Sequence, residues 1–208
     1  MQKEGLEMLD LRGKNIKFLT SEKTHFNSLY LGDGKAWDRM GAAIKKRLKT
    51  HLETVQNKKC AYCGVRVEVA GRGEIEHIVP KGKSLYPQFT FHELNLVLIC
   101  ELCNGSSRKG SKDIISRNSP IYSLNKFKIV HPFFDNPETH YDWVNNAKIN
   151  IIEKSSKGRY SIDLFQLDSI QMTEYRAKDK VIEIFLKTYD ATDPLQVELF
   201  NALIALPR

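Results

Sequence analysis

The stretch GEIEHIVPK, residues 73–81, combines side chains that can do acid, base and metal chemistry. Glu74 and Glu76 are two positions apart, so in an extended strand both carboxylates point to the same face. His77 follows directly, and an imidazole with an unperturbed pKa near ~6.5 can accept a proton near neutral pH. A packed core avoids such a group, because buried charges must be paired or bound. The stretch is therefore a candidate reaction site.

The four cysteines of the chain lie on both sides of this stretch, in two pairs with the same spacing. The pairs are Cys60-Ala-Tyr-Cys63 and Cys100-Glu-Leu-Cys103. A CxxC turn presents two thiolates on one side, and two such turns complete a tetrahedral zinc site. Two disulfides or a redox pair are the alternatives, but a reducing compartment disfavours disulfides, and redox pairs normally occur singly. A site of four thiolates is saturated, so we expect a structural zinc that contributes folding free energy.

The segment from about Lys59 to Lys112 resembles the HNH endonucleases. The resemblance rests on EIEHIVPK, on the asparagine within ELNLVLIC, and on CELCN followed by a basic pair. It implies a ββα-metal core in which His77, Asn95 and Asn104 stand at the three positions that give the family its name. The third position is asparagine where the name suggests histidine, and asparagine still offers an oxygen to a metal.

The same resemblance implies a role for each residue of this site. His77 would be the general base that accepts a proton from water. Glu76 and Asn104 would hold a catalytic Mg²⁺ or Mn²⁺, because their oxygen ligands suit such ions and leave positions for water and phosphate oxygens. Asn95 would tie the hairpin loop together and so position the histidine. Glu74 could be a further ligand or a plain exposed charge.

Basic side chains also lie near the motif in sequence. Lys81, Lys83, Arg108 and Lys109 could contact phosphates, or could be ordinary solvated side chains. His92 is close in sequence to Asn95 but is not expected to compete as a base. The histidines at 25, 51, 131 and 140 have no motif around them and are expected to be structural or exposed.

The charge distribution favours a polyanionic partner. The chain of 208 residues has a formal net charge of +7. Residues 1–59 hold 13 Lys and Arg against 7 Asp and Glu, whereas residues 114–208 hold 12 of each. Apolar residues at helical spacing predict a helix over residues 36–55 that buries one face. Its other face, with Lys45, Lys46, Arg47 and Lys49, could follow a phosphate backbone or could simply be solvated.

Turn residues and periodicity divide the chain into three regions. Residues 1–58 form a basic helical segment with a short strand at 15–20, residues 59–112 the HNH module, and residues 113–208 an α+β scaffold or partner-docking region. In the last region INIIE and RYSIDLF predict a hairpin across SSKG. Two helices follow it, with apolar faces that include Ile170, Val181 and Ile184, and Pro194 lies near the start of the second.

The order of features after the motif resembles a subgroup of HNH proteins of the Septu type. The marks are an insert with YPQF, the segment HPFFDNPETHYDWV and then IDLFQLDS. The resemblance implies an anti-phage defence effector, sometimes associated with retrons, that is restrained by a partner ATPase. No run of the sequence is long enough for a membrane span and the first residues do not read as a signal peptide, so we expect a cytoplasmic protein.

Together these features predict an α+β protein with a zinc-stabilised ββα-metal core, flanked by helical segments, that cleaves nucleic acid. DNA is the first expectation for the substrate. One alternative is a ribonuclease that acts on tRNA or other RNA with the same residues, because a one-metal mechanism does not need a 2′-hydroxyl. The other is a zinc-stabilised nucleic-acid-binding or adaptor protein without catalysis, against which the presence of Glu76, His77 and Asn104 argues.

Overall fold

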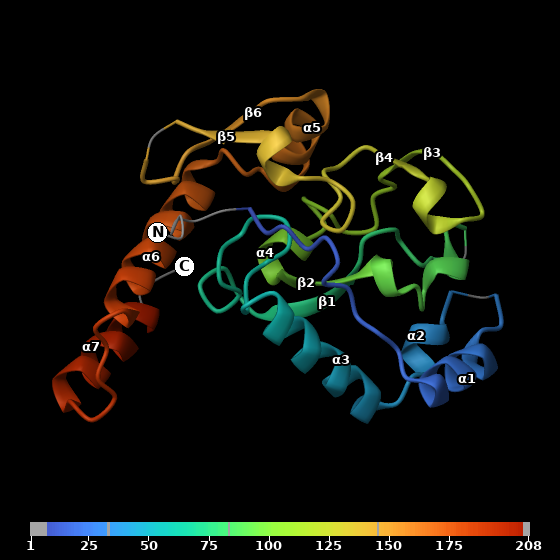
Figure 1. Ribbon diagram of the computed structural model, residues 1–208, viewed down its shortest axis with the longest axis horizontal. Coiled ribbons are helices and arrows are strands. Elements are labelled where there is room, and N and C mark those ends of the chain that lie inside the picture. Colours follow the sequence, from blue (N-terminus) through green and yellow to red (C-terminus); the bar gives the residue numbers. More distant parts are fainter. Residues whose placement is uncertain (1–7, 33, 83, 145, 206–208) are drawn as a thin grey trace.

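A two-stranded antiparallel hairpin lies near the middle of the molecule, with helices on several sides of it (Figure 1). The computed structural model describes residues 8–32, 34–82, 84–144 and 146–205. Helices and three small antiparallel sheets make the protein α+β, as the sequence predicts. Lys83, one of the predicted phosphate contacts, lies outside the described residues.

The central hairpin pairs β1 (Gly73–His77) with β2 (Leu96–Cys100). Gly73 lies opposite Cys100 and His77 opposite Leu96, so the candidate base ends the first strand where the second begins. All of β2 is buried, as its uninterrupted aliphatic sequence LVLIC requires. Helix α4 (Glu101–Asn104) follows β2 without a linker. The chain therefore runs strand, loop, strand and helix through the region that carries the motif.

The predicted helix over residues 36–55 is two helices, α2 (Ala36–Arg39) and α3 (Ala42–Val55). The break falls at Gly41, which precedes α3 in an extended conformation with φ −60° and ψ 149°. Leu48 and Leu52 are fully buried, so the predicted apolar stripe of α3 is confirmed.

Gln56, directly after α3, joins this helix to the central hairpin. Its side-chain amide donates to the carbonyl of Leu98 at 2.8 Å and accepts the backbone N–H of the same residue at 2.8 Å. Gln56 is completely buried, so both bonds form away from water. The side chain thus substitutes for a neighbouring strand along β2.

The predicted strand over residues 15–20 is wrong. Residues 15–19 have no regular structure, and helix α1 (Thr20–Leu29) begins at the end of that stretch. Glu22 stabilises this helix start, because its carboxylate accepts the backbone N–H of Leu19 at 2.9 Å. Arg47 of α3 donates two hydrogen bonds to the same carboxylate, at 2.6 and 2.5 Å. This ion pair fixes α1 against α3.

The predicted hairpin between residues 149–153 and 159–165 is also wrong. Strand β6 (Ile151–Glu153) pairs instead with β5 (Tyr141–Trp143), and SKGRYSIDLF forms helix α5 (Ser156–Phe165). Ser155 caps this helix by accepting the backbone N–H of Gly158 at 2.9 Å. A further small sheet joins β3 (Ile115–Arg117) to β4 (Lys126–Phe127).

Two helices end the described chain, as predicted. These are α6 (Ile170–Leu186) and α7 (Pro194–Ala205), and Pro194 is the first residue of the second one. Figure 1 shows them running away from the rest of the molecule at the left. The predicted apolar face of α6 is wrong in part, because Ile170, Val181 and Ile184 are exposed.

The buried face of α6 carries charges as well as apolar groups. Asp179, fully buried, pairs with Arg66 of the cysteine-bounded segment, with 3.2 Å between Oδ1 and Nε. Arg176, also fully buried, donates from Nη1 to the carbonyls of Leu167 at 2.6 Å and Ile149 at 3.1 Å. Polar anchors at these positions explain why apolar spacing alone misplaced the buried face of the helix. The buried apolar residues of the described chain form one core, from Met8 to Ile182.

Candidate metal centre and reaction site

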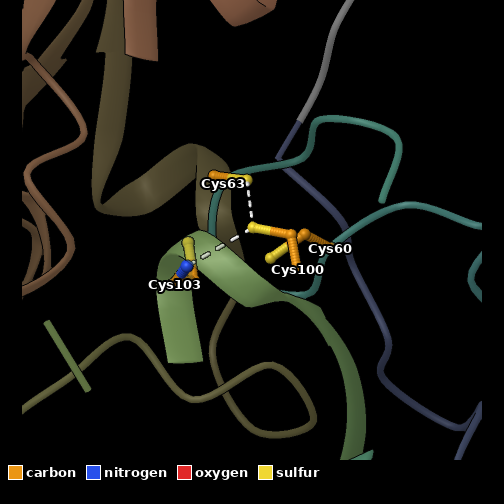
Figure 2. Close-up of side chains that lie close together, drawn as sticks. All are labelled: Cys60, Cys63, Cys100 and Cys103. Atoms are coloured by element: carbon orange, nitrogen blue, oxygen red, sulfur yellow. Dashed lines mark hydrogen bonds between the residues drawn. The ribbon is translucent and has the colours of Figure 1, made fainter. Parts of the chain in front are cut away.

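The four cysteines converge at one end of the central hairpin (Figure 2). Their sulfur atoms all lie within 4.8 Å of one another, and those of Cys63 and Cys100 are 3.9 Å apart. Four sulfurs at the usual zinc distance of about 2.3 Å in a tetrahedron are about 3.8 Å from each other. All four residues are buried and none forms a disulfide in the structure, which favours a metal site over the two-disulfide alternative.

Local backbone structure sets the direction of these thiols. The first CxxC turn closes where the backbone N–H of Gly64 donates to the carbonyl of Cys60 at 3.0 Å. Gly64 has φ +74°, a conformation that favours glycine. The N–H of Ala61 donates to Leu98 of β2 at 3.0 Å, which fixes this turn beside the second pair. In the second pair Cys100 precedes α4, and its sulfur accepts the N–H of Cys103 at 3.4 Å.

The cysteine cluster could therefore hold a metal ion such as zinc. The donor set suits zinc, the spacing of the sulfurs suits tetrahedral coordination, and no side chain has to move far to complete it. Among the described residues, the four cysteines are the only group of three or more His, Cys, Asp or Glu side chains close enough together to hold a metal ion. An ion bound by Glu76 and Asn104 would thus depend on water and substrate oxygens for its remaining ligands.

The candidate reaction site lies on the strand that ends at His77. Glu74 accepts a hydrogen bond from the side-chain amide of Asn104 at 2.5 Å, which brings α4 against β1. Lys109 donates to Glu76 with 3.2 Å between Nζ and Oε1. Glu74, Glu76, Asn104 and Lys109 therefore meet on one side of the hairpin.

The electrostatics of the two carboxylates differ. Burial raises the pKa of Glu76, although the charge of Lys109 opposes this change. Burial also acts to raise the pKa of Glu74, but hydrogen bonds from Asn104 and Arg72 outweigh it and lower that pKa below its ordinary value. Glu74 is therefore ionised at neutral pH, and it accepts the side-chain N–H of Asn104.

His77 is held as a neutral imidazole. Its Nε2 lies 3.0 Å from the backbone carbonyl of Thr90, and a carbonyl only accepts, so Nε2 carries the proton and Nδ1 keeps the lone pair. Burial, with the positive charges of Lys81 and Lys109, lowers the pKa of His77 to about 3. The ring of Trp37 packs perpendicular to the imidazole, with centroids 4.7 Å apart. His77 is thus in the form that can accept a proton, and an approaching anionic phosphate would raise its basicity.

Asn95 ties together the loop between the strands. It is fully buried, accepts the backbone N–H of Val79 at 2.6 Å, and donates to the carbonyls of Val79 at 3.1 Å and Phe89 at 2.9 Å. The hydroxyl of Tyr122 donates to the same Asn95 oxygen at 3.0 Å. Thr90, whose carbonyl accepts the hydrogen bond from His77, directly follows Phe89 in the sequence. The Asn95 contacts therefore support the backbone that orients the histidine.

The remaining predicted cations fall in different surroundings. Lys109 is fully buried and Arg108 nearly so, which rules out solvated surface positions for both. Arg108 donates to Gln171 of α6 at 3.3 Å, and its Nη1 is buried without a protein partner. Lys81 is half-buried close to His77, near enough for its charge to affect the histidine pKa. His92 accepts the N–H of Leu94 through Nδ1 at 3.2 Å, which is a structural role.

Replacing Lys109 with methionine is expected to lower the free energy of unfolding by about 3 kcal/mol, because it strips a largely buried carboxylate of its partner. The Glu76 side chain is 14% exposed, which places the effect at the lower end for buried pairs. Without the lysine the pKa of Glu76 rises further, so the folded state binds more protons than the unfolded one. The loss should therefore be smallest where Glu76 is protonated in both folded proteins, and should grow as pH rises through the raised pKa of Glu76 in the unaltered protein.

Urea unfolding of this variant at several pH values is the measurement, with Lys109→Met/Glu76→Gln as the matched control. The double variant removes the charge as well as its partner and should recover much of the loss. A variant loss that stays constant between pH 4 and pH 8 would contradict the buried pair.

Asn95→Ala is expected to lower the free energy of unfolding by about 3 kcal/mol or more, because it leaves several buried polar groups without partners. Tyr122→Phe removes one of these hydrogen bonds, together with the contact of the hydroxyl with Nε2 of His131 at 3.1 Å, and should cost about 2 kcal/mol. Chemical denaturation of the two variants gives the comparison. Equal losses would mean that the Asn95 amide does not bridge the loop.

Some contacts of this site have no signal in the sequence. Trp37 is part of an apolar helical stripe, and nothing in that pattern indicates its edge contact with His77. Tyr122 lies in a segment that looks like a connector, yet its hydroxyl reaches Asn95. The sequence shows the basic pair Arg108 and Lys109 after CELCN, but it does not indicate that both side chains are buried. These contacts join segments distant in sequence, which periodicity cannot bring together.

The chain is similar to Septu proteins, as its feature order predicts, although no family model matches it. A Septu protein PtuB of Bacillus mycoides (strain KBAB4) is 29% identical over 148 residues, and one of Bacillus thuringiensis is 30% identical over 132. Each alignment covers 63% of this chain, and 50% and 45% of those proteins respectively. A Septu protein PtuA of Bacillus mycoides (strain KBAB4) is 26% identical over 147 residues, which are 63% of this chain and 20% of that protein. The chain spans about half the length of the two PtuB proteins.

None of the helices in the described residues combines the length and the apolar character that crossing a bilayer would need.

Proposed function

We propose that the protein is a metal-dependent endonuclease with an HNH site on a ββα-metal core. The observation that carries the proposal is the placement of Glu76 and His77 at the end of β1, beside β2 and α4, with Lys109 against the carboxylate. The order of strand, loop, strand and helix agrees with the HNH resemblance of the sequence. Asn95 has the loop-bridging contacts that the resemblance implies for it.

In this proposal His77 accepts a proton from water through Nδ1 as the water oxygen bonds to the phosphorus. The bond between phosphorus and the leaving oxygen then breaks, and the leaving oxygen takes a proton from a second water molecule. The Nε2 bond to Thr90 keeps the ring in the tautomer that this step needs. A divalent ion held by Glu76 and Asn104 would supply positive charge to the phosphate and the leaving oxygen. The Lys109 ammonium against the Glu76 carboxylate supports an attraction of this group for positive charge, and a bound ion would have to share or displace that contact.

We further propose that the nuclease is the effector of an anti-phage defence system and is regulated by a partner ATPase. The similarity to proteins named Septu protein PtuB and Septu protein PtuA supports this, because the two names point to a two-component system. DNA is the expected substrate. The net charge of +7 suits any nucleic acid, so RNA remains the alternative.

Incubation of the purified protein with plasmid DNA, single-stranded DNA and total tRNA, with Mg²⁺ or Mn²⁺, tests the proposal. We expect cleavage of at least one substrate, dependent on the added ion and abolished in His77→Ala. Addition of the partner ATPase is the second arm, because restraint or activation by the partner would change the rate. Binding without any cleavage in both arms would favour a non-catalytic adaptor and would refute the endonuclease.

A further inference from the structure

A pocket of 640 Å³ lies between α1 and the segment of residues 87–94, on the loop that supports His77. Its apolar walls are aromatic: Phe18, Phe26 and Phe91 line it together with Tyr30. The rings of Phe26 and Phe91 are stacked with centroids 4.3 Å apart, which gives the wall a rigid base. Tyr30 is 41% exposed, so its ring is available to a ligand. Pockets of this volume take small molecules with one or two ring systems.

Two cations also line the pocket. Lys17 and Lys23 both approach Glu93, with Nζ to carboxylate distances of 3.7 and 3.4 Å. Their side chains are 76% and 60% exposed, so both ammonium groups can reach an anion. Glu93 also accepts the backbone N–H of Phe18 at 2.8 Å, which fixes the carboxylate as part of the wall. The pocket thus joins an aromatic surface to two lysines that face one carboxylate, which leaves a net positive charge for an anion.

Neutral hydrogen-bonding groups complete the lining. Asn15, Asn27 and Gln88 also line the pocket. His92 accepts the N–H of Leu94 through Nδ1, so in its neutral form the proton is on Nε2, which is then a donor. Such groups can both donate to and accept from the polar edge of a heterocycle.

We propose that this pocket binds a nucleotide, with the base against the aromatic wall beside Tyr30 and the phosphate at Lys17 and Lys23. A nucleotide is the ligand class that combines a flat polar ring with a nearby dianion, which are the two features that the lining matches. A purely apolar ligand would make no use of the lysines and the polar side chains, and a simple anion would make no use of the aromatic wall.

The pocket is physically connected to the candidate base. The ring centroids of Phe91 and Trp37 are 6.4 Å apart, and the Trp37 ring in turn packs perpendicular to that of His77. Thr90, next to Phe91, accepts the hydrogen bond from His77. A nucleotide in the pocket would therefore contact the segment that orients His77. The bound nucleotide could have two sources, which offer the same chemistry. It could belong to the strand being cut, an assignment that rests on the proposed function, or it could be a free nucleotide, an assignment that does not.

Direct binding distinguishes the two sources. Titration calorimetry, without added Mg²⁺ so that no cleavage occurs, would compare AMP, GMP, CMP and UMP with a 5′-phosphorylated tetranucleotide. Comparable affinity for a mononucleotide and the tetranucleotide would assign a free nucleotide. Binding of the tetranucleotide alone would assign the substrate strand. Failure of every one of these probes to bind at millimolar concentration would overturn the proposal.

Two variants locate the binding. Tyr30→Ala should weaken it about tenfold through lost stacking, and Lys23→Gln should weaken it and reduce its dependence on salt. Lys14→Gln is the matched control, because Lys14 is exposed and outside the pocket lining, and it should bind as the unaltered protein does. Equal affinities for all three variants would also overturn the proposal. If the protein binds a nucleotide but cleaves no substrate, the nucleotide-binding proposal stands and the endonuclease proposal is refuted.

Discussion

Cys100→Ser is expected to abolish stoichiometric zinc binding and to unfold the region around the central hairpin. Serine is nearly isosteric with cysteine, so packing alone predicts a small loss. Structural zinc sites, however, contribute about 10–16 kcal/mol of binding free energy, which equals or exceeds the whole stability of an ordinary domain. Cys100 is fully buried where β2 meets α4, and its sulfur is 3.9 Å from that of Cys63.

Zinc content by elemental analysis and unfolding by circular dichroism would measure the effect. Treatment of the unaltered protein with a chelator is the parallel arm, and added zinc should restore the folded signal. A variant that keeps its unfolding midpoint, or an unaltered protein that is folded and carries no metal, would refute a structural zinc.

His77→Ala is expected to slow cleavage by about 10²- to 10⁴-fold, the usual contribution of a general base. His77 is only 5% exposed and contacts Trp37, so alanine also leaves a cavity. His77→Gln separates the two effects, because its amide can still donate to Thr90 while it offers no basic nitrogen. Both variants should lose activity, and the glutamine variant should lose less stability. His25→Gln, on the exposed surface of α1, should cleave normally.

The stability of the unaltered protein should carry a signature of His77. Its pKa falls from 6.5 to about 3 on folding, so the unfolded state binds the proton first as pH decreases. The stabilisation that comes from the neutral imidazole is therefore complete above pH 6.5 and is lost as pH falls towards 3. Between pH 7.5 and pH 5 the advantage over His77→Gln should shrink by about 2 kcal/mol. A difference that does not change with pH would contradict the buried neutral histidine.

The sequence predicted best the features that depend on local spacing. The convergence of the four cysteines follows from two tight turns, and the structure confirms it. Helices α6 and α7 follow from apolar repeats and from Pro194. The nuclease roles of Glu76, His77, Asn95 and Asn104 stay predictions that the cleavage experiments test.

The sequence failed where a tertiary contact or a cap decides the structure. RYSIDLF has the composition of a strand, yet the Ser155 cap and the burial of Ile162 and Phe165 favour a helix there. Residues 15–19 alternate like a strand but are held as irregular chain, with the N–H of Phe18 bonded to Glu93. In each case a residue far along the chain, or a single side-chain oxygen, outweighs intrinsic propensity.

The pair between Arg66 and Asp179 has a mechanical consequence for the C-terminal helices. A helix anchored only by apolar contacts can rotate slightly or shift along its axis at small cost, because one aliphatic group can replace another. Helix α6 cannot do so, since any displacement would leave Asp179 buried without its cation. The part of α6 that carries Asp179 is therefore tied to the segment that holds Cys60 and Cys63. A displacement of this part of α6 would therefore also move Arg66, three residues after Cys63.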